Sequence, residues 1–495
     1  MESLHLTENR ESDSLADQVR NAIIWRSGSQ IIAQLVQWGA TFLVIRILAP
    51  ADYGLFAMTQ VVILFLNMLN GYGLASGLIQ QSDVTERQIR QLFGMMLIVN
   101  AVLATVQLLL APVAAAYYRQ PIVGQMLQVQ ALLYLTTPFM ALAYALLSRS
   151  MDFRAQAKVN IYASIASASA ALGGALAGMG VWTLVVAPLV MFTVRAIGMT
   201  VVARSFIWPV FDFRGAGHLA RYGGLMAVGQ LFWFVESQAD VFIAGRSLDP
   251  HWLGIYTTSL FLTQIFVSKV VPPLNEVAFS AYARLQHDSE AVANAFARSI
   301  RVIMTAALPF YVGLAVTAEP LVLTMLGAKW AEAVPIVRLL ACAMPLLTLQ
   351  VLLPPACDAK GRPGISVQNG ATGAVLLTIA YLVGINWGVI GLATSWLVAY
   401  PVYLSISLWR SLPVIGVSAR ALLGSIMPPM MAALGMGLVV AMIAAALPPL
   451  PVALQLIILV ATGSMVYVGW LGVFAKGLIG EIVAIVRRQP LPATA

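Results

Sequence analysis

Residues 42–54 read FLVIRILAPADYG, and residues 242–254 read FIAGRSLDPHWLG. Five identities recur between them at a constant offset of 200 residues, beginning in the first copy at Phe42, Arg46, Leu48, Pro50 and Gly54. A second match, at offset 208, pairs Gly180-Val181 with Gly388-Val389 and Leu184 with Leu392. Two matches in the same order indicate two copies of one unit in parallel orientation, a pattern typical of transporters.

The composition places this repeat in a membrane. Of the 495 residues, 60% are hydrophobic and only 10% are charged, and the mean hydropathy is +0.86. Soluble domains carry about 25% charged residues. The net charge of +8 is spread singly between apolar runs rather than gathered in one patch, so we expect no nucleic-acid partner. The sequence therefore predicts a polytopic membrane protein in contact with membrane lipids.

Proline, glycine and charge clusters divide the chain into fourteen apolar segments, each long enough for a transmembrane helix. We expect an all-α fold with two pseudo-symmetric six-helix lobes, followed by two C-terminal helices. The predicted helices are 24–48, 54–79, 90–113, 123–148, 158–178, 181–203, 218–245, 252–276, 296–317, 333–356, 364–385, 388–409, 420–446 and 452–475.

Lysine and arginine set the predicted orientation. With the N-terminus inside, most of the 28 Lys and Arg residues fall on the cytoplasmic side, and an even number of spans returns the C-terminus there. The predicted division is a cytoplasmic tail 1–22, a first lobe 23–204, a cytoplasmic connector 205–217, a second lobe 218–410, two further helices within 420–476 and a cytoplasmic tail 477–495.

Enzyme chemistry is not expected from this sequence. The four histidines lie in the tail or in connections, and none pairs at metal-ligand spacing. The chain has no GxxxxGK[ST] phosphate loop and no nucleophile constellation. We therefore predict no catalytic residue, no metal site and no cofactor, with H⁺ or Na⁺ as the candidate coupling ion of a transporter.

Four ordered segments resemble the polysaccharide transporters known as Wzx-type flippases, most closely the colanic-acid type. They are VIRILAPADYGLFAMTQ at 44–60, GYGLASGLIQQSD at 71–83, ADVFIAGRSLDPHWLGIYTTSL at 239–260 and VVPPLNEVAFSAYARLQHD at 270–288. The superfamily of these proteins also contains multidrug and toxin exporters and lipid II flippases. One departure is Asp249, which stands where the family often has glycine before an outer turn.

The resemblance implies a V-shaped bundle in the bacterial inner membrane. It implies a flippase, a secondary transporter that moves undecaprenyl-diphosphate-linked oligosaccharides from the cytoplasmic to the periplasmic leaflet. We expect such a protein to act as a monomer, with polymerase and chain-length regulator proteins as neighbours. Two other functions stay open: a multidrug exporter on the same fold, and a membrane polysaccharide polymerase or ligase. The enzyme is disfavoured because the longest outer connection, 318–332, has one basic residue and no histidine.

A polar stripe on the first helix is a candidate substrate-binding surface. Its residues follow one another at intervals of four, four, three and four positions: Arg26, Gln30, Gln34, Gln37 and Thr41. That spacing places them on one helix face. The stripe either lines a cleft between the lobes and binds sugar hydroxyls or the diphosphate, or holds helices together. Five aligned polar residues favour the cleft.

Two acids and four cations complete the candidate site. Glu236 and Asp240 lie four residues apart on the seventh helix, where desolvation and mutual repulsion favour the protonated form of at least one. They either bind the coupling ion or form a structural ion pair with Arg195 or Lys269. Arg195 and Lys269 stand alone in apolar runs and either meet the diphosphate or snorkel to the interface. Arg298 and Arg301 are expected at the start of the ninth helix, as headgroup ligands or as topology anchors.

Overall fold

The structure is a computed structural model that describes residues 28–69, 85–150, 152–211 and 217–474, with the side chains of all but 217–229. These residues are helical apart from short connections, and twelve helical segments among them are long and apolar enough to cross a membrane. The chain forms two compact units, one ending at Leu231 and the other beginning at Phe232. The predicted all-α polytopic fold is confirmed.

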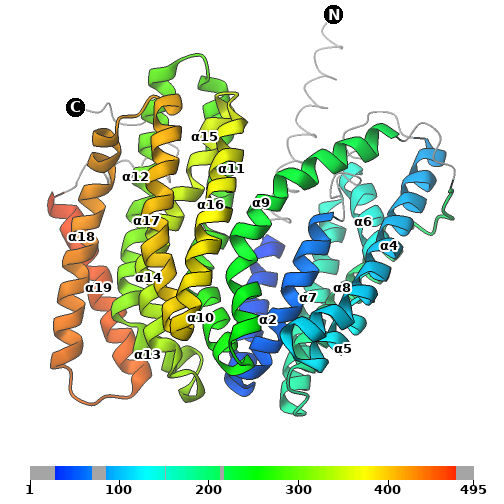
Figure 1. The fold of residues 1–495 in the computed structure, drawn as a ribbon, viewed down its shortest axis with the longest axis horizontal. Coiled ribbons are helices and arrows are strands. Elements are labelled where there is room, and N and C mark those ends of the chain that lie inside the picture. Colours follow the sequence, from blue (N-terminus) through cyan, green and yellow to red (C-terminus); the bar gives the residue numbers. More distant parts are fainter. Residues whose placement is uncertain (1–27, 70–84, 151, 212–216, 475–495) are drawn as a thin grey trace, which may run out of the picture. The chain divides into compact units, whose positions relative to one another are not determined.

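The first unit has a core formed by packed pairs of helices. Helix α4 packs against α5, α6 against α8, and α7 runs along α8 (Figure 1). Leu66, Leu103 and Tyr134 form one buried cluster of this unit. The described helices are Gly28–Ile47, α2 (Pro50–Leu69), α4 (Glu86–Tyr118), α5 (Pro121–Gln130), α6 (Leu133–Arg149), α7 (Phe153–Leu176), α8 (Trp182–Val202) and the first part of α9 (Gly217–Ser247).

The chain leaving α8 is fastened to α4. The Val210 N–H donates to the Arg90 carbonyl at 3.0 Å, and Arg90 Nε donates to the Trp208 carbonyl at 3.0 Å. A Cβ added at Gly94 would lie 2.5 Å from the Val210 carbonyl oxygen, so this close approach requires glycine. Residues 205–211 of the predicted connector therefore belong to the first unit, and we call them the strap. Residues 212–216 of the connector lie outside the described residues.

In the second unit, α12 packs against both α14 and α18, α16 packs along α17, and α19 follows α18 (Figure 1). The elements are the remainder of α9, α10 (Pro250–Lys269), α11 (Val271–Leu285), α12 (Ser289–Val316), α13 (Ala318–Met325), η1 (Ala328–Trp330), α14 (Ala333–Val351), α15 (Leu353–Ala359), α16 (Pro363–Gly384), η2 (Ile385–Trp387), α17 (Gly388–Ile415), α18 (Ala419–Ala446) and α19 (Val452–Phe474).

Both copies of the first repeat have the same local structure. One helix ends at Ile47 in the first copy and at Ser247 in the second. The next helix begins at Pro50 in the first copy and at Pro250 in the second. Proline suits the first turn of a helix, because its fixed φ is helical and its missing N–H would have no partner there. The repeat at an offset of 200 residues is therefore present in the local helix–turn–helix structure as well as in the sequence.

The turns of the repeats explain which glycines are required. Gly180 and Gly388 have φ of +55° and +69°; Gly180 lies in the turn before α8, and Gly388 is the first residue of α17, directly after η2. This backbone region favours glycine. Asp249 has an ordinary φ of −70°, and its Oδ1 accepts a 3.0 Å hydrogen bond from the Trp252 N–H. The turn at Asp249 therefore works as a helix N-cap and needs no glycine.

Three of the predicted helices are broken. The segment predicted as 252–276 ends as α10 at Lys269, and α11 begins at Val271. Pro272 and Pro273 lack the N–H groups that would continue the hydrogen-bond ladder. The predicted helices 123–148 and 333–356 are likewise each divided in two. The expectation that Lys269 stands inside a continuous apolar helix is therefore wrong: it occupies the last turn of α10 and is exposed.

Carbonyls released by proline are capped from neighbouring helices. The Tyr467 hydroxyl on α19 donates to the Thr305 carbonyl at 2.8 Å, four residues before Pro309 in α12. Asn275 Nδ2 on α11 donates to the Val351 carbonyl at 3.0 Å, four residues before Pro355. In an apolar medium an unpaired carbonyl costs several kcal/mol. These hydrogen bonds therefore give the two carbonyl groups a partner. They also attach α19 to α12 and α11 to α14.

Candidate functional site

The second unit contains a buried acid. Asp240 on α9 is only 1% exposed. Its Oδ2 accepts a 2.6 Å hydrogen bond from the Tyr256 hydroxyl on α10, and its Oδ1 accepts a 2.7 Å bond from the Val241 N–H. The Trp396 Nε1–H on α17 donates in turn to the Tyr256 oxygen at 2.9 Å. One hydrogen-bonded chain therefore links the acid to three helices.

Glu236 lies one turn before Asp240 and joins the same group. The Tyr403 hydroxyl on α17 is hydrogen-bonded to its carboxyl group. The rings of Trp396 and Tyr400 stack with centroids 5.0 Å apart and planes 7° apart. We call Glu236, Asp240, Tyr256, Trp396 and Tyr403 the carboxylate cluster. Its members come from α9, α10 and α17, and the second unit assembles it by itself.

The alternative of a structural ion pair finds no support within the described residues of the second unit. Both acids are hydrogen-bonded to hydroxyl groups and a backbone N–H, and no cationic side chain in the described part of this unit is paired with either acid. Lys269, one of the expected partners, is exposed at the end of α10. A carboxylate here would be an uncompensated buried charge, and binding a cation or a proton removes that cost.

The Tyr256 hydroxyl should be important for stability, and the same cluster offers a matched control. Tyr256→Phe removes the acceptor of the Trp396 indole N–H and the donor to Asp240. We expect it to lower the free energy of unfolding by about 1–3 kcal/mol, because buried polar groups lose their partners. Tyr381→Phe should be neutral, because the equally buried Tyr381 hydroxyl has no hydrogen-bond partner among the described residues. Thermal unfolding of both purified variants checks this, and equal melting temperatures would contradict it.

The polar stripe on the first described helix remains a prediction. Arg26 lies outside the described residues, Gln30 is exposed, and Gln34 and Gln37 are half-buried. Gln37 Nε2 donates weakly to the Met191 sulfur on α8 at 3.8 Å. Among the described residues, Gln30 and Gln34 make no side-chain hydrogen bond to a neighbouring helix. If the stripe held neighbouring helices together, its side chains would make hydrogen bonds of this kind.

Each unit also contains an arginine whose buried Nε–H group makes no hydrogen bond within the described residues. Arg195 in α8 and Arg298 in α12 are half-buried, and the Nε atom of each is buried without a hydrogen-bond partner in the described part of the chain. The expectation that Arg298 and Arg301 begin a helix is wrong, because α12 starts at Ser289, with Asp288 as its N-cap. Both arginines therefore lie more than two turns inside α12.

The first unit contains a small polar cavity of about 240 Å³ between α2, α4, α5, α6 and α8. We call it the amide cavity, because three glutamines and an asparagine contribute to its lining. Its polar lining residues are Gln60, Asn67, Gln107, Gln130, Tyr134 and Thr137.

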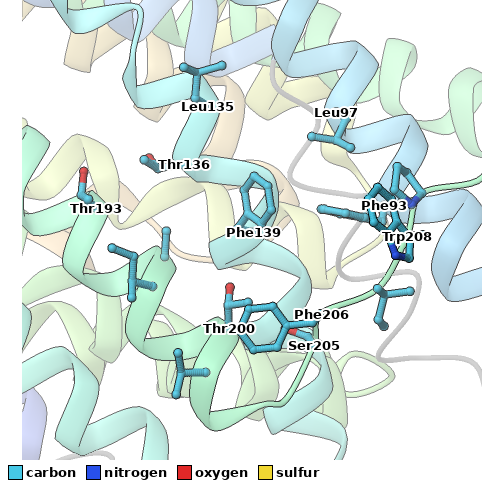
Figure 2. Close-up of a pocket in the computed structure, with 15 residues that line it drawn as sticks. Phe93, Leu97, Leu135, Thr136, Phe139, Thr193, Thr200, Ser205, Phe206 and Trp208 are labelled. Atoms are coloured by element: carbon cyan, nitrogen blue, oxygen red, sulfur yellow. The ribbon is translucent and has the colours of Figure 1, made fainter.

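A larger hollow of about 710 Å³ lies between α4, α6, α8 and the strap (Figure 2). Phe93, Phe139 and Phe206 point into it, and its polar groups are hydroxyls such as those of Thr136 and Thr200 (Figure 2). Its lining includes no Asp or Glu. The hollow therefore offers a mainly apolar surface with a few hydroxyl groups.

Sequence reasoning found the two acids but missed their partners. A signal was present in α17, where Trp396, Tyr400 and Tyr403 follow at intervals of four and three residues and so share a helix face. The lining of the amide cavity was missed as well. A comparable series lies at the end of α5 and in α6, where Gln130, Tyr134 and Thr137 follow at the same two intervals.

Residues 43–335 match the model of a family described as "Polysaccharide biosynthesis protein". The teichuronic acid biosynthesis protein TuaB of Bacillus subtilis is 23% identical over 413 residues, 80% of this chain and 85% of that protein. The succinoglycan biosynthesis transport protein ExoT of Rhizobium meliloti is 27% identical over 374 residues, 75% of this chain and 76% of that protein.

Among solved structures, the inward closed conformation of the lipid II flippase MurJ is similar in fold. Its TM-score is 0.73 at 12% sequence identity, over 92% of this chain and 100% of that chain. At this level of identity the likeness shows a shared fold, and it covers nearly all of the described helices.

Proposed function

Because the chain belongs to the polysaccharide biosynthesis protein family, we propose that it is a flippase for lipid-linked oligosaccharides. It is a transporter rather than an enzyme. Its cargo is the undecaprenyl-diphosphate-linked repeat unit of a polysaccharide, which it moves from the cytoplasmic to the periplasmic leaflet of the bacterial inner membrane. The observation that carries this proposal is the family match over residues 43–335, together with a fold like that of a lipid II flippase.

The proposed orientation places both termini in the cytoplasm. It is supported by the distribution of Lys and Arg between alternate connections, since cytoplasmic loops are enriched in these residues. The protein acts as a monomer in this proposal, and polymerase and chain-length regulator proteins are its proposed neighbours.

The proposed driving ion is a proton rather than Na⁺. Hard cations are held by lone pairs of oxygen atoms. Around Asp240 the carboxyl oxygens instead accept hydrogens from the Tyr256 hydroxyl and the Val241 N–H. A carboxyl group surrounded by donors can take up and release a proton, but it offers few free lone pairs to a metal ion.

The proposed partners of the diphosphate are the incompletely satisfied arginines. Arginine binds phosphate oxygens through several N–H donors in a planar fork. Arg195 and Arg298 each keep a buried Nε without a hydrogen-bond partner in the described residues, which supports a role for both. Gln30, Gln34, Gln37, Lys269 and Arg301 remain proposed substrate-binding residues, supported by their positions in the sequence.

Reconstitution tests the function against its rival. Vesicles containing the purified protein and an undecaprenyl-diphosphate-linked oligosaccharide should expose the glycan to an external glycosidase faster than protein-free vesicles. A parallel set of vesicles is loaded with a fluorescent organic cation. Glycan movement without cation movement is the expected result, and cation movement alone would favour the multidrug exporter.

Arg26 heads the predicted stripe on the cytoplasmic side, where the cargo enters. We expect Arg26→Ala to reduce glycan export strongly without lowering the amount of folded protein, because a diphosphate leaving water needs a counter-charge. Arg46→Ala, which removes an exposed cation near the other end of the helix, is the control and should export normally. Full export by a normally expressed Arg26→Ala protein would remove Arg26 from the site.

A further inference from the structure

We infer that the amide cavity of the first unit binds one neutral sugar ring of the cargo, an inference that rests on the proposed function. The cavity lies wholly within the first unit, whereas the carboxylate cluster belongs to the second. It is therefore a site of its own rather than an extension of the proton site.

The cavity is lined by buried polar groups that the protein leaves unpaired. Gln107, Gln130 and Tyr134 are 0%, 2% and 4% exposed. Gln107 Oε1, Gln130 Oε1 and the Tyr134 hydroxyl have no hydrogen-bond partner among the described residues. Gln107 is already oriented, since its Nε2 donates to the Leu127 carbonyl at 2.7 Å. Unpaired buried groups are costly, so three around one cavity indicate a ligand that brings hydroxyl donors.

Charge and size select the kind of ligand. The lining residues include no Lys, Arg, His, Asp or Glu, so neither a diphosphate nor an organic cation would find a counter-charge. The volume of about 240 Å³ lies below the roughly 300–1,000 Å³ typical of sites for drug-sized ligands. It corresponds to about eight water molecules, which is also about the space of one sugar ring.

The apolar walls suit a sugar as well. Phe56 and Phe192 line the cavity from α2 and α8, and Pro188 lies one turn before Phe192. A sugar ring has hydroxyls around its edge and C–H groups on its faces. Amide and phenol groups can therefore pair with the edge while aromatic side chains cover a face. Water alone would leave these apolar walls without a partner.

Protection of a cysteine from alkylation tests the inference. The two native thiols, Cys342 and Cys357, lie in the second unit and are replaced by alanine. Thr137→Cys then places one thiol in the cavity lining, and Gln60→Cys on α2 serves if the first variant folds poorly. The probes are methyl glycosides of glucose, galactose, mannose and N-acetylglucosamine. Sorbitol, an open-chain polyol, is the matched control.

We expect at least one glycoside to slow alkylation about tenfold when present at about ten times its dissociation constant, whereas sorbitol has no effect. Equal rates with every glycoside, or the same slowing by sorbitol, would overturn the inference and leave a water-filled cavity. Glycan flipping by the wild-type protein is measured in vesicles in parallel. Flipping without protection refutes the sugar pocket alone, whereas protection without flipping refutes the proposed function and leaves the pocket.

Two conservative substitutions separate binding from folding. Tyr134→Phe and Gln130→Met each remove an unpaired polar group and keep its volume. We expect neither to lower the melting temperature, whereas both abolish glycoside protection and slow flipping. Tyr118→Phe is the control, because Tyr118 is as buried as Tyr134, lies in α4 of the same unit and does not line the cavity. A drop in melting temperature with full protection would make these groups structural.

Discussion

Asp240→Asn is expected to abolish the response of transport to a proton gradient. Asparagine keeps the shape of the side chain but cannot take up and release a proton at this position. The same outcome is expected for Glu236→Gln, one turn away on α9 and hydrogen-bonded to Tyr403. Substrate binding should survive in both variants, because the carboxylate cluster lies within the second unit and its polar groups bind one another.

The measurement compares flipping with and without an imposed proton gradient, and then with an imposed Na⁺ gradient, in vesicles that contain each variant. The variants should flip at one slow rate whatever the gradient, whereas the wild type should be accelerated by protons alone. Glu276→Gln removes an exposed carboxylate of α11 in the same unit and should behave as the wild type. A normal gradient response in both acid variants would make the acids structural and require another energy source.

The repeat predicts that the proposed coupling resides in the second half of the chain only. Residues 36 and 40, at offset 200 from the two acids, are valine and alanine. Ala40 is buried, and neither of these two side chains is ionisable. The first unit has kept the helix–turn–helix geometry of the repeat but carries neutral polar groups instead, in the amide cavity. In these two proposals the proton-coupling acids lie in the second unit and the sugar-binding cavity lies in the first.

Most of the fold could be predicted from the sequence, because a span must be apolar along its whole length. The fourteen predicted segments correspond to described helices, and both copies of the repeat turn at the same positions. The pairs Pro272-Pro273 and Pro354-Pro355 mark places where a helix can kink, but the sequence does not state that the helix ends there. A helix that continues through a proline and one that stops there have the same composition. Capping by a distant residue, such as Tyr467 at the Thr305 carbonyl, decides how a bend is satisfied.

The site could be predicted only in part, for a related reason. Acids inside an apolar run are conspicuous, so Glu236 and Asp240 could be found from spacing and composition. Tyrosine and tryptophan are ordinary in membrane helices, and only the packing of α10 and α17 brings Tyr256 and Trp396 to Asp240. The amide cavity draws on five helices, and no local pattern states that Gln107 and Gln130 share it.

Gly391→Ala is expected to destabilise the second unit severely. A Cβ added at Gly391 would overlap the Gly384 carbonyl oxygen at the end of α16 and lie 2.7 Å from the Trp387 Cβ. The carbonyl oxygen belongs to the backbone, and the Trp387 Cβ is bonded directly to the backbone of η2, so neither can move aside by a side-chain rotation and the two helices would have to separate. Overpacking of this kind costs about 1–3 kcal/mol and sometimes more, and rigid backbone on both sides argues for the upper end.

The same substitution should also disturb the carboxylate cluster, because α17 carries both the crowded turn and two members of the cluster, Trp396 and Tyr403. Ser395 donates to the Ala380 carbonyl at 2.9 Å, and the next residue, Trp396, donates to Tyr256. Moving the start of α17 away from α16 therefore moves Trp396 away from its partner. Gly391→Ala protein that still folds should melt earlier and respond weakly to the proton gradient. Gly424→Ala in α18, where an added Cβ meets nothing within 4 Å, should match the wild type in both measurements. An unchanged melting temperature for Gly391→Ala would mean that α16 and α17 do not approach this closely.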